Sequence, residues 1–151
     1  MLELARLCDR DEINRLALQV HALHVQWRPD IYEMVEDLYP VSRMEASVGA
    51  RELYVAKLND QIVGYVLLNM KNSDKIGCLK RKIMTVHEFC VEESLRNHGI
   101  GKAMMDDVHA LAKAFGCTDL QLGVYPQNDE AVGFYQKCGF TIKSIDMQRK
   151  V

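Results

Sequence analysis

The chain has 151 residues, a length that suits one domain with a sizeable hydrophobic core. Charged residues make up 26% and apolar residues 48%, which is ordinary for a globular protein. The formal charge of −2 and the pI near 6.2 argue against a protein that binds nucleic acid by neutralising its phosphates. Five cysteines include no C-x-x-C pair and leave an odd one over, so we expect the reducing cytoplasm rather than disulfides or a zinc site. With no signal peptide or membrane span recognisable, we expect a single domain over residues 1–151.

The N-terminal part of the chain predicts one strand and two helices. Residues 2–7 alternate loosely between apolar and polar, which is typical of a strand. Asp9, with Glu12 three residues later, predicts a capping box that begins a helix, and the apolar stripe of residues 13–27 continues it. Residues 30–38 predict a second, shorter helix.

A hairpin comes next. Residues 43–48 are ambiguous, but 52–57 and 62–69 both read as strands. The residues between them, Asn59-Asp60-Gln61, are typical of a tight turn.

The central segment, residues 83–115, predicts a strand, a glycine-rich turn and a helix. The strand covers 83–91, the turn lies within 95–102, and an apolar helical stripe follows until Gly116 ends it. Glycine lets the backbone come close to a ligand, and the first N–H groups of a helix have no acceptor inside it. We therefore predict an anion-binding site at this turn.

The last part of the chain predicts a strand at 119–124, a helix at 128–138 and a final strand at 140–147. Asn128 is placed to cap the helix and Gly139 to end it. The full order, β-α-α-β-β-β-α-β-α-β, indicates an α/β or α+β domain built on a single mixed sheet.

The amino-acid sequence of the turn distinguishes among nucleotide-binding motifs. A dinucleotide fingerprint needs glycine where Met104 stands, and a P-loop needs glycine at Arg96 and Ser or Thr at Ala103. What remains is R-x-x-G-x-G, and here the chain resembles the GNAT superfamily of acetyl-CoA-dependent N-acetyltransferases. A second block agrees with that family's closing pattern: Leu120, Leu122, Val124, Asn128, Ala131, Phe134, Tyr135, Gly139 and Phe140.

The resemblance covers nearly the whole chain and implies a mostly antiparallel sheet flanked by helices. It also implies acetyl-CoA as the donor, no metal, and a turn that cradles the pyrophosphate. The positions implied for this cradle are Arg96, Asn97, His98, Gly99, Ile100, Gly101 and Lys102. A side chain at Gly101 is expected to push into the space that the diphosphate needs.

Four further positions take roles from the resemblance. The backbones of Phe89 and Val91 would hold pantetheine, and the Phe89 N–H would steady the thioester oxygen. The Tyr135 hydroxyl would protonate the departing thiolate, although its helical spacing also suits a packed core residue. Asn128 would contact CoA as well as cap its helix.

The base that deprotonates the amine is left open. Some family members place a glutamate where this chain has Thr85, so Glu88 and His87 are the nearest candidates. These two neighbours point to opposite faces of a strand, so at most one faces the acceptor, and Glu88 is as readily a partner of a surface cation.

The acceptor site is expected beside the first helix and the loop after it. Residues that gather there in the sequence are His24, Trp27, Arg28, Asp30, Tyr32 and Tyr39. We take His24, Trp27, Tyr32 and His87 as substrate-binding candidates, although each of the first two alone suits a packing role.

The predicted function is direct acetyl transfer from acetyl-CoA to a primary amine of a small molecule or of a peptide or protein. The alternative is a non-catalytic domain that senses acyl-CoA, which the missing glutamate at Thr85 favours and the intact Tyr135 disfavours. The sequence of the turn does not match a P-loop, which excludes a phosphoryl-transfer enzyme. We expect no nucleic-acid or membrane partner, and a possible homodimer through the final strand.

Overall fold

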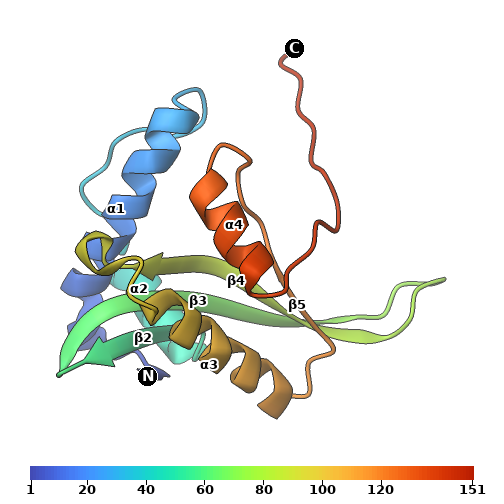
Figure 1. Cartoon of the computed structure of the whole chain (residues 1–151), viewed down its shortest axis with the longest axis horizontal. Helices are drawn as coiled ribbons and strands as arrows, with labels where there is room; N and C mark the ends of the chain where they lie inside the picture. The colour runs from blue at the N-terminus through green and yellow to red at the C-terminus, as the bar shows by residue number, and fades with distance from the viewer.

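A computed structural model describes residues 1–151 as a single five-stranded sheet flanked by helices (Figure 1). The strand order is β1-β2-β3-β4-β5; the first four strands are antiparallel neighbours, and β5 joins β4 in parallel. The strands are β1 (Leu2–Leu4), β2 (Leu53–Leu58), β3 (Gln61–Ser73), β4 (Arg81–Val91) and β5 (Asp119–Leu122). This arrangement confirms the predicted α+β class.

Four helices and two short 3₁₀ turns connect the strands. They are η1 (Leu7–Asp9), α1 (Arg10–Trp27), α2 (Val41–Gly49), η2 (Glu93–Leu95), α3 (Ile100–Ala114) and α4 (Asp129–Lys137). None of these helices combines the length and the hydrophobicity that crossing a bilayer requires.

The two faces of the sheet carry different helices because side chains alternate along each strand. In β2, Leu53 and Val55 belong to a core cluster that also contains residues of α1 and α2. Tyr54, on the opposite face, joins a cluster that contains residues of α3. The sheet therefore separates an α1/α2 face from an α3/α4 face.

Several elements are confirmed where local chemistry is strong. The β2–β3 hairpin turns through Asn59 and Asp60, whose φ values of 50° and 61° match a tight two-residue turn. The Asn128 side chain accepts a hydrogen bond from the Ala131 N–H at 3.2 Å and so caps α4 as predicted. The strand–turn–helix unit of residues 83–115 is also present.

The start of the chain differs from the prediction. The strand ends at Leu4, because the Asp9 carboxylate accepts the Arg6 N–H at 2.8 Å and closes η1. Asp9 therefore makes no side-chain cap on α1, and Glu12 pairs with Arg15 at 3.0 Å. The predicted capping box was wrong.

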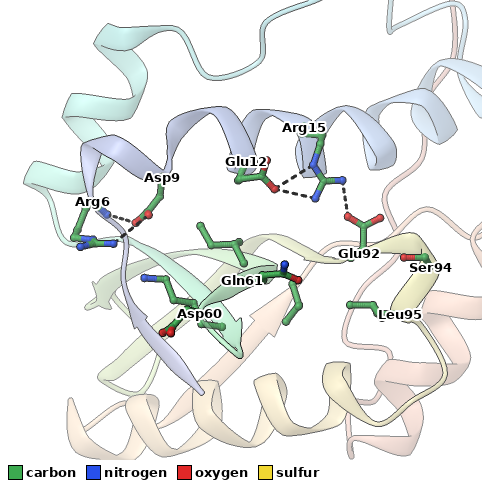
Figure 2. Close-up of a pocket in the computed structure, with 12 residues that line it drawn as sticks. Arg6, Asp9, Glu12, Arg15, Asp60, Gln61, Glu92, Ser94 and Leu95 are labelled. Carbon is green, nitrogen blue, oxygen red and sulfur yellow. Dashed lines mark hydrogen bonds and ion pairs between the residues drawn. The ribbon is translucent and has the colours of Figure 1, made fainter.

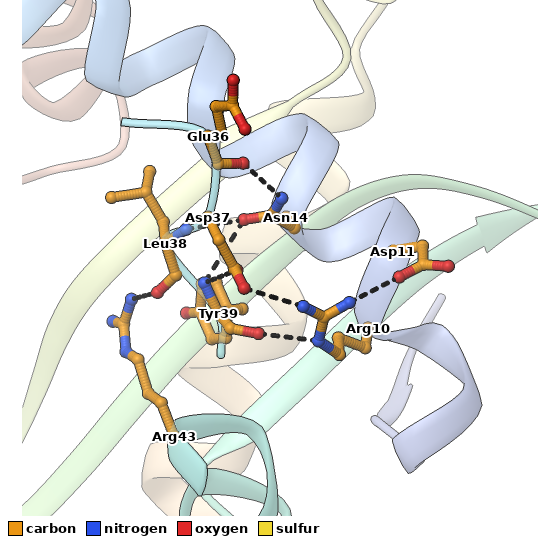
Figure 3. Close-up of polar contacts among 8 residues, drawn as sticks. All are labelled: Arg10, Asp11, Asn14, Glu36, Asp37, Leu38, Tyr39 and Arg43. Carbon is orange, nitrogen blue, oxygen red and sulfur yellow. Dashed lines mark hydrogen bonds and ion pairs between the residues drawn. The ribbon is translucent and has the colours of Figure 1, made fainter. Parts of the chain in front are cut away.

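Residues 30–38 form no helix; the second helix is α2, in the stretch that the sequence left ambiguous. The backbone of this segment bonds to side chains of α1 instead (Figure 3). The Asn14 amide donates to the Glu36 carbonyl at 3.2 Å and accepts the Leu38 N–H at 2.8 Å. Arg10 Nε then donates to the Tyr39 carbonyl at 2.9 Å. These long-range bonds hold the segment in an irregular path along α1.

The predicted final strand, residues 140–147, was also wrong. After α4 the chain has no secondary structure and continues to the C-terminus as an irregular segment (Figure 1). A strand needs a neighbour to bond with, and this segment has none in the chain.

Candidate active site

The sheet opens between β4 and β5. Their parallel pairing stops at Val86 and Leu122, although β4 continues to Val91. The Glu92 N–H donates to the Val63 carbonyl of β3 at 2.8 Å, so by alternation the backbone groups of Phe89 and Val91 point away from β3. The Val91 carbonyl accepts Arg96 Nε at 3.1 Å, so this part of β4 presents the free backbone groups of Phe89 and the Val91 N–H where β5 has turned away.

The glycine-rich turn lies at the end of this opening. Asn97 and Gly99 both have positive φ, at 64° and 83°, which turns successive N–H groups toward a common side. The first backbone bond of α3 runs from the Ala103 N–H to the Gly99 carbonyl. The six N–H groups of residues 97–102 have no acceptor within the chain. Six consecutive unpaired donors suit a polyanionic ligand.

The two cations of the turn differ in availability. Arg96 Nε donates to the Val91 carbonyl at 3.1 Å, and its guanidinium makes no ion pair with a carboxylate. Lys102 Nζ lies 2.7 Å from an Asp106 oxygen, and that carboxylate raises the pKa of Lys102. Arg96 is therefore the free cation, and Lys102 is partly occupied. The neighbouring His98 is exposed, with Nδ1 2.7 Å from the Arg96 carbonyl oxygen.

The structure shows a packing reason for glycine at position 101. A Cβ placed there would lie 3.3 Å from the Phe134 ring of α4 and 3.6 Å from Val91 Cγ2. A side chain at this position would therefore first meet Phe134, and its effect on the space for a diphosphate stays a prediction. Glycine is needed here for the close approach of α3 and α4.

Tyr135 lies on α4 among aromatic side chains. Its ring centroid is 6.3 Å from that of Phe89 and 5.3 Å from that of Phe134. Burial, assisted by Cys138 nearby, raises the pKa of Tyr135 to about 12. The structure gives its hydroxyl no hydrogen-bond partner in the chain, yet the oxygen is not sealed from solvent. Tyr135 therefore has a protonated hydroxyl whose hydrogen has no acceptor in the chain.

Glu88 lies on the other face of β4. Its carboxylate accepts hydrogen bonds from the hydroxyls of Tyr39 at 2.7 Å and Tyr65 at 2.8 Å, and it pairs with Arg43. The Arg43 guanidinium also lies 4.0 Å from the centre of the Tyr39 ring. Burial, followed by the Glu88 charge, raises the pKa of both tyrosines, so both stay donors. Three of about four acceptor positions on this carboxylate are used, which leaves one.

An aromatic cluster forms close to Glu88, where α1 ends. His24 lies 5.1 Å from Tyr32 and 5.6 Å from Tyr125, and 6.0 Å from Trp27, between ring centroids. The Tyr32 and Tyr125 hydroxyls share a hydrogen bond of 2.8 Å. Burial and then the nearby His21 lower the pKa of His24, so it is neutral at pH 7, while the Glu88 charge acts weakly in the opposite direction.

The structure thus brings together three of the four predicted acceptor residues. His87 lies exposed beside the β3–β4 bulge and makes no ring contact with the cluster. Sequence reasoning missed Tyr125, Arg43 and Tyr65, which come from distant parts of the chain. Tyr125 could have been noticed, because it directly follows the second motif block.

A separate depression of about 680 Å³ lies beside α1 and the β2–β3 turn (Figure 2). It contains none of the predicted site residues. Its charges are largely paired with one another, Arg6 with Asp9 at 3.6 Å and Arg15 with Glu12 at 3.0 Å. We therefore place no chemistry there.

Known proteins resemble this chain in sequence. A sequence model described as the Acetyltransferase (GNAT) family matches residues 14–140. The chain is 31% identical over 96 residues to YvbK, an uncharacterized N-acetyltransferase of Bacillus subtilis strain 168, with 63% of this chain and 56% of that protein covered. It is 27% identical over 120 residues to the peptidyl-lysine N-acetyltransferase YjaB of Escherichia coli strain K12, covering 80% and 64%. The matches therefore span less than two thirds of these relatives.

Solved structures agree in fold. A mutant of the BH1408 protein from Bacillus halodurans has a TM-score of 0.94 and 27% identity, with 100% of this chain and 99% of that one covered. A ribosomal-protein-alanine N-acetyltransferase from Brucella melitensis biovar Abortus 2308 has a TM-score of 0.70 and 19% identity, covering 100% and 99%. At that identity the second likeness concerns the fold alone.

Proposed function

Since this chain belongs to the GNAT family of acetyltransferases, we propose that it moves an acetyl group directly from acetyl-CoA to a primary amine. The observation that carries this proposal is the opening beyond Val86, where free backbone groups of β4 lead to the six unpaired N–H groups of residues 97–102. A long, flexible thioester with a diphosphate at one end matches both features.

In this proposal the diphosphate binds at the turn. The N–H groups of residues 97–102 and the free nitrogens of Arg96 donate to its oxygens, with Lys102 contributing if it leaves Asp106. Pantetheine lies along the backbone of Phe89 and Val91, and the amide of Asn128 remains free to contact CoA, because the cap uses only its oxygen.

The chemical step follows from this placement. The amine nitrogen attacks the thioester carbonyl carbon, and the Phe89 N–H stabilises the oxygen as it gains negative charge. The C–S bond then breaks, and the Tyr135 hydroxyl gives its proton to the sulfur. A pKa of about 12 keeps Tyr135 protonated until the thiolate forms. The amine nitrogen must also lose a proton, to water or to a side chain of the acceptor site.

Glu88 is placed to serve the acceptor. Its one remaining acceptor position can take a hydrogen bond from the amine or from a water that receives the proton. Because three donors already hold it, its geometry is fixed before substrate arrives. The aromatic rings of His24, Trp27, Tyr32 and Tyr125 offer a cationic amine favourable cation–π contacts close by.

The lysine side chain of a peptide is the first acceptor to test. YjaB, which matches 80% of this chain, is named for that activity. A lysine side chain is also a primary amine on a flexible stem, which suits a site bordered by aromatic rings. Small amines remain the second choice.

Two measurements test the proposal. Calorimetric titration with acetyl-CoA should show binding, and Arg96→Gln should raise the dissociation constant about 10- to 100-fold, because a charged hydrogen bond to phosphate is lost. Lys113→Gln is the matched control, since it removes a positive charge from the other end of α3 and should leave affinity unchanged. Labelled acetyl-CoA is then incubated with lysine peptides and small amines. Binding without labelled product would favour the acyl-CoA sensor, and no binding would refute the proposal.

A further inference from the structure

The hairpin end of β3 and β4 projects from the molecule as a two-stranded ribbon. β2 pairs with β3 only as far as Leu67, and β5 pairs with β4 only from Ile83 onward. β3 and β4 nevertheless stay paired with each other out to Ser73 and Arg81. The ribbon, residues 71–82, therefore extends beyond the neighbouring strands on both edges (Figure 1).

The tip of the ribbon is an ordered turn that exposes two large apolar side chains. The Cys78 N–H donates to the Lys75 carbonyl at 3.0 Å, and Gly77 has φ of 82°, as the third residue of a type II turn requires. Ile76 at the corner of this turn and Leu79 just beyond it are 106% and 84% exposed. The turn thus holds both side chains at the end of the ribbon, where nothing else in the chain covers them.

Positive charge surrounds this tip. Residues 71–82 contain five of the 19 basic residues and one of the 21 acidic residues, so in a chain of net −2 the ribbon is net +4 and the rest is net −6. Arg81 and Lys82 bond to groups of the body of the molecule. Lys71, Lys75 and Lys80 are exposed and make no ion pair, so their charges are available to a partner.

Free lysines around exposed apolar side chains match the surface of an anionic lipid bilayer. Apolar side chains of a peripheral protein enter the boundary between head groups and acyl chains, while lysines beside them are attracted to the anionic lipids. A nucleic acid would satisfy the lysines but not Ile76 and Leu79, because it offers mainly phosphates and polar base edges. The negative charge of the rest of the molecule is repelled by an anionic surface, so the ribbon is the part that approaches it.

We propose that the ribbon docks this protein end-on to a membrane that contains anionic lipids, with Ile76 and Leu79 inserted among the head groups. This contact is peripheral and replaces the expectation of no membrane partner, which rested on the absence of a membrane span. β4 runs from Arg81 in the ribbon to Phe89 at the opening, a distance of about 26 Å along an extended strand. Docking therefore leaves the candidate active site open to acceptors at the membrane surface.

The experiment sediments the full-length chain with lipid vesicles. The protein should bind vesicles of phosphatidylcholine with phosphatidylglycerol but not phosphatidylcholine alone, and high salt should release it. Lys71→Gln/Lys75→Gln/Lys80→Gln should weaken binding about 100-fold, since each lysine near an anionic surface contributes about fivefold. The matched control, Lys137→Gln/Lys143→Gln/Lys150→Gln, removes the same charge outside the ribbon and should bind nearly as tightly as the unaltered protein.

A second pair of variants tests the apolar tip. Ile76→Ser/Leu79→Ser should weaken vesicle binding at least about 10-fold. Its control is Ile142→Ser/Ile145→Ser, at positions that are 76% and 80% exposed outside the ribbon, which should leave binding unchanged. All of the altered side chains are exposed, so each variant should fold.

Several results would overturn the proposal. Absence of vesicle binding would do so, and so would equal binding to neutral vesicles. A serine variant of the tip that binds as tightly as the unaltered protein would overturn it too, since the ribbon would then recognise a polyanion such as a nucleic acid. An equal loss in either control would place the contact elsewhere. None of these measurements uses acetyl transfer, so their outcome is independent of the proposed function.

Discussion

Removal of the Tyr135 hydroxyl is the sharpest test of the proposed chemistry. In Tyr135→Phe the ring keeps its contacts with Phe89, Phe134 and Phe140, at centroid distances of 5.3 to 6.3 Å. The lost hydroxyl has no hydrogen-bond partner in the chain, so the free energy of unfolding should change by less than about 0.5 kcal/mol. Affinity for acetyl-CoA should also persist, because the cradle is untouched.

The rate should fall steeply. Loss of a positioned general acid costs about 10²- to 10⁴-fold in kcat, or about 2.7 to 5.5 kcal/mol in the activation free energy. The product should be counted by mass spectrometry, because Cys8 and Cys78 are exposed thiols that would consume a thiol reagent. In the unaltered enzyme, ionisation of Tyr135 should not lower kcat until the pH approaches 12.

Tyr54→Phe is the matched control. Tyr54 is 8% exposed and belongs to the same α3-facing core cluster, and burial raises its pKa as well. Its hydroxyl also has no hydrogen-bond partner in the chain, but it lies on β2, away from the opening. Full turnover by Tyr135→Phe would refute the acid role, and an equal loss in Tyr54→Phe would show that the effect is structural.

Three further substitutions probe the site. Glu88→Ala leaves the Tyr39 and Tyr65 hydroxyls without their acceptor, so it should lower the free energy of unfolding by about 1–3 kcal/mol and raise the acceptor KM. Denaturant titration and kinetics measure these effects, with Glu45→Ala, at an exposed position, as the control. Unchanged stability would contradict the hydrogen bonding. Gly101→Ala should destabilise the fold by about 1–2 kcal/mol, because its Cβ would lie 3.3 Å from the Phe134 ring. Gly133→Ala, with open space around it in α4, should stabilise the fold by about 0.5–1 kcal/mol. Thermal melts that shift in the same direction for both variants would refute the argument from close approach. The pKa of His24 is below 6.5 in the folded state, so as the pH falls the unfolded chain binds this proton first, and stability should fall below about pH 6.5. His24→Gln should flatten that part of the profile of melting temperature against pH. An unaltered profile would exclude His24 as the source of the pH dependence.

Local chemistry explains what could be predicted from the sequence. The Asn59-Asp60 turn, the Asn128 cap and the glycine-rich turn each depend on a few neighbouring residues, so their sequence patterns are sufficient. The unpaired donors of the turn could be predicted for the same reason, because residues 97–102 are consecutive and their unpaired N–H groups follow from the start of a helix.

The errors occurred where distant residues compete with local preference. Residues 30–38 have the apolar spacing of a helix, but the Asn14 amide takes their backbone groups and prevents it. Residues 140–147 have the composition of a strand, but residues 141–147 make no backbone hydrogen bond to another strand, so no strand forms.

The sequence by itself determined the family, the order of most elements and the glycine-rich turn, because these depend on short motifs and on the periodicity of apolar residues. Only the tertiary structure decided what surrounds Glu88 and His24. It showed that Glu88 is held by Tyr39, Tyr65 and Arg43, and that Tyr125 lies against His24. It also showed that a side chain at Gly101 would meet Phe134. The physical reason is that these contacts join residues more than 20 positions apart, whose meeting depends on how the sheet and helices pack and leaves no local pattern in the chain.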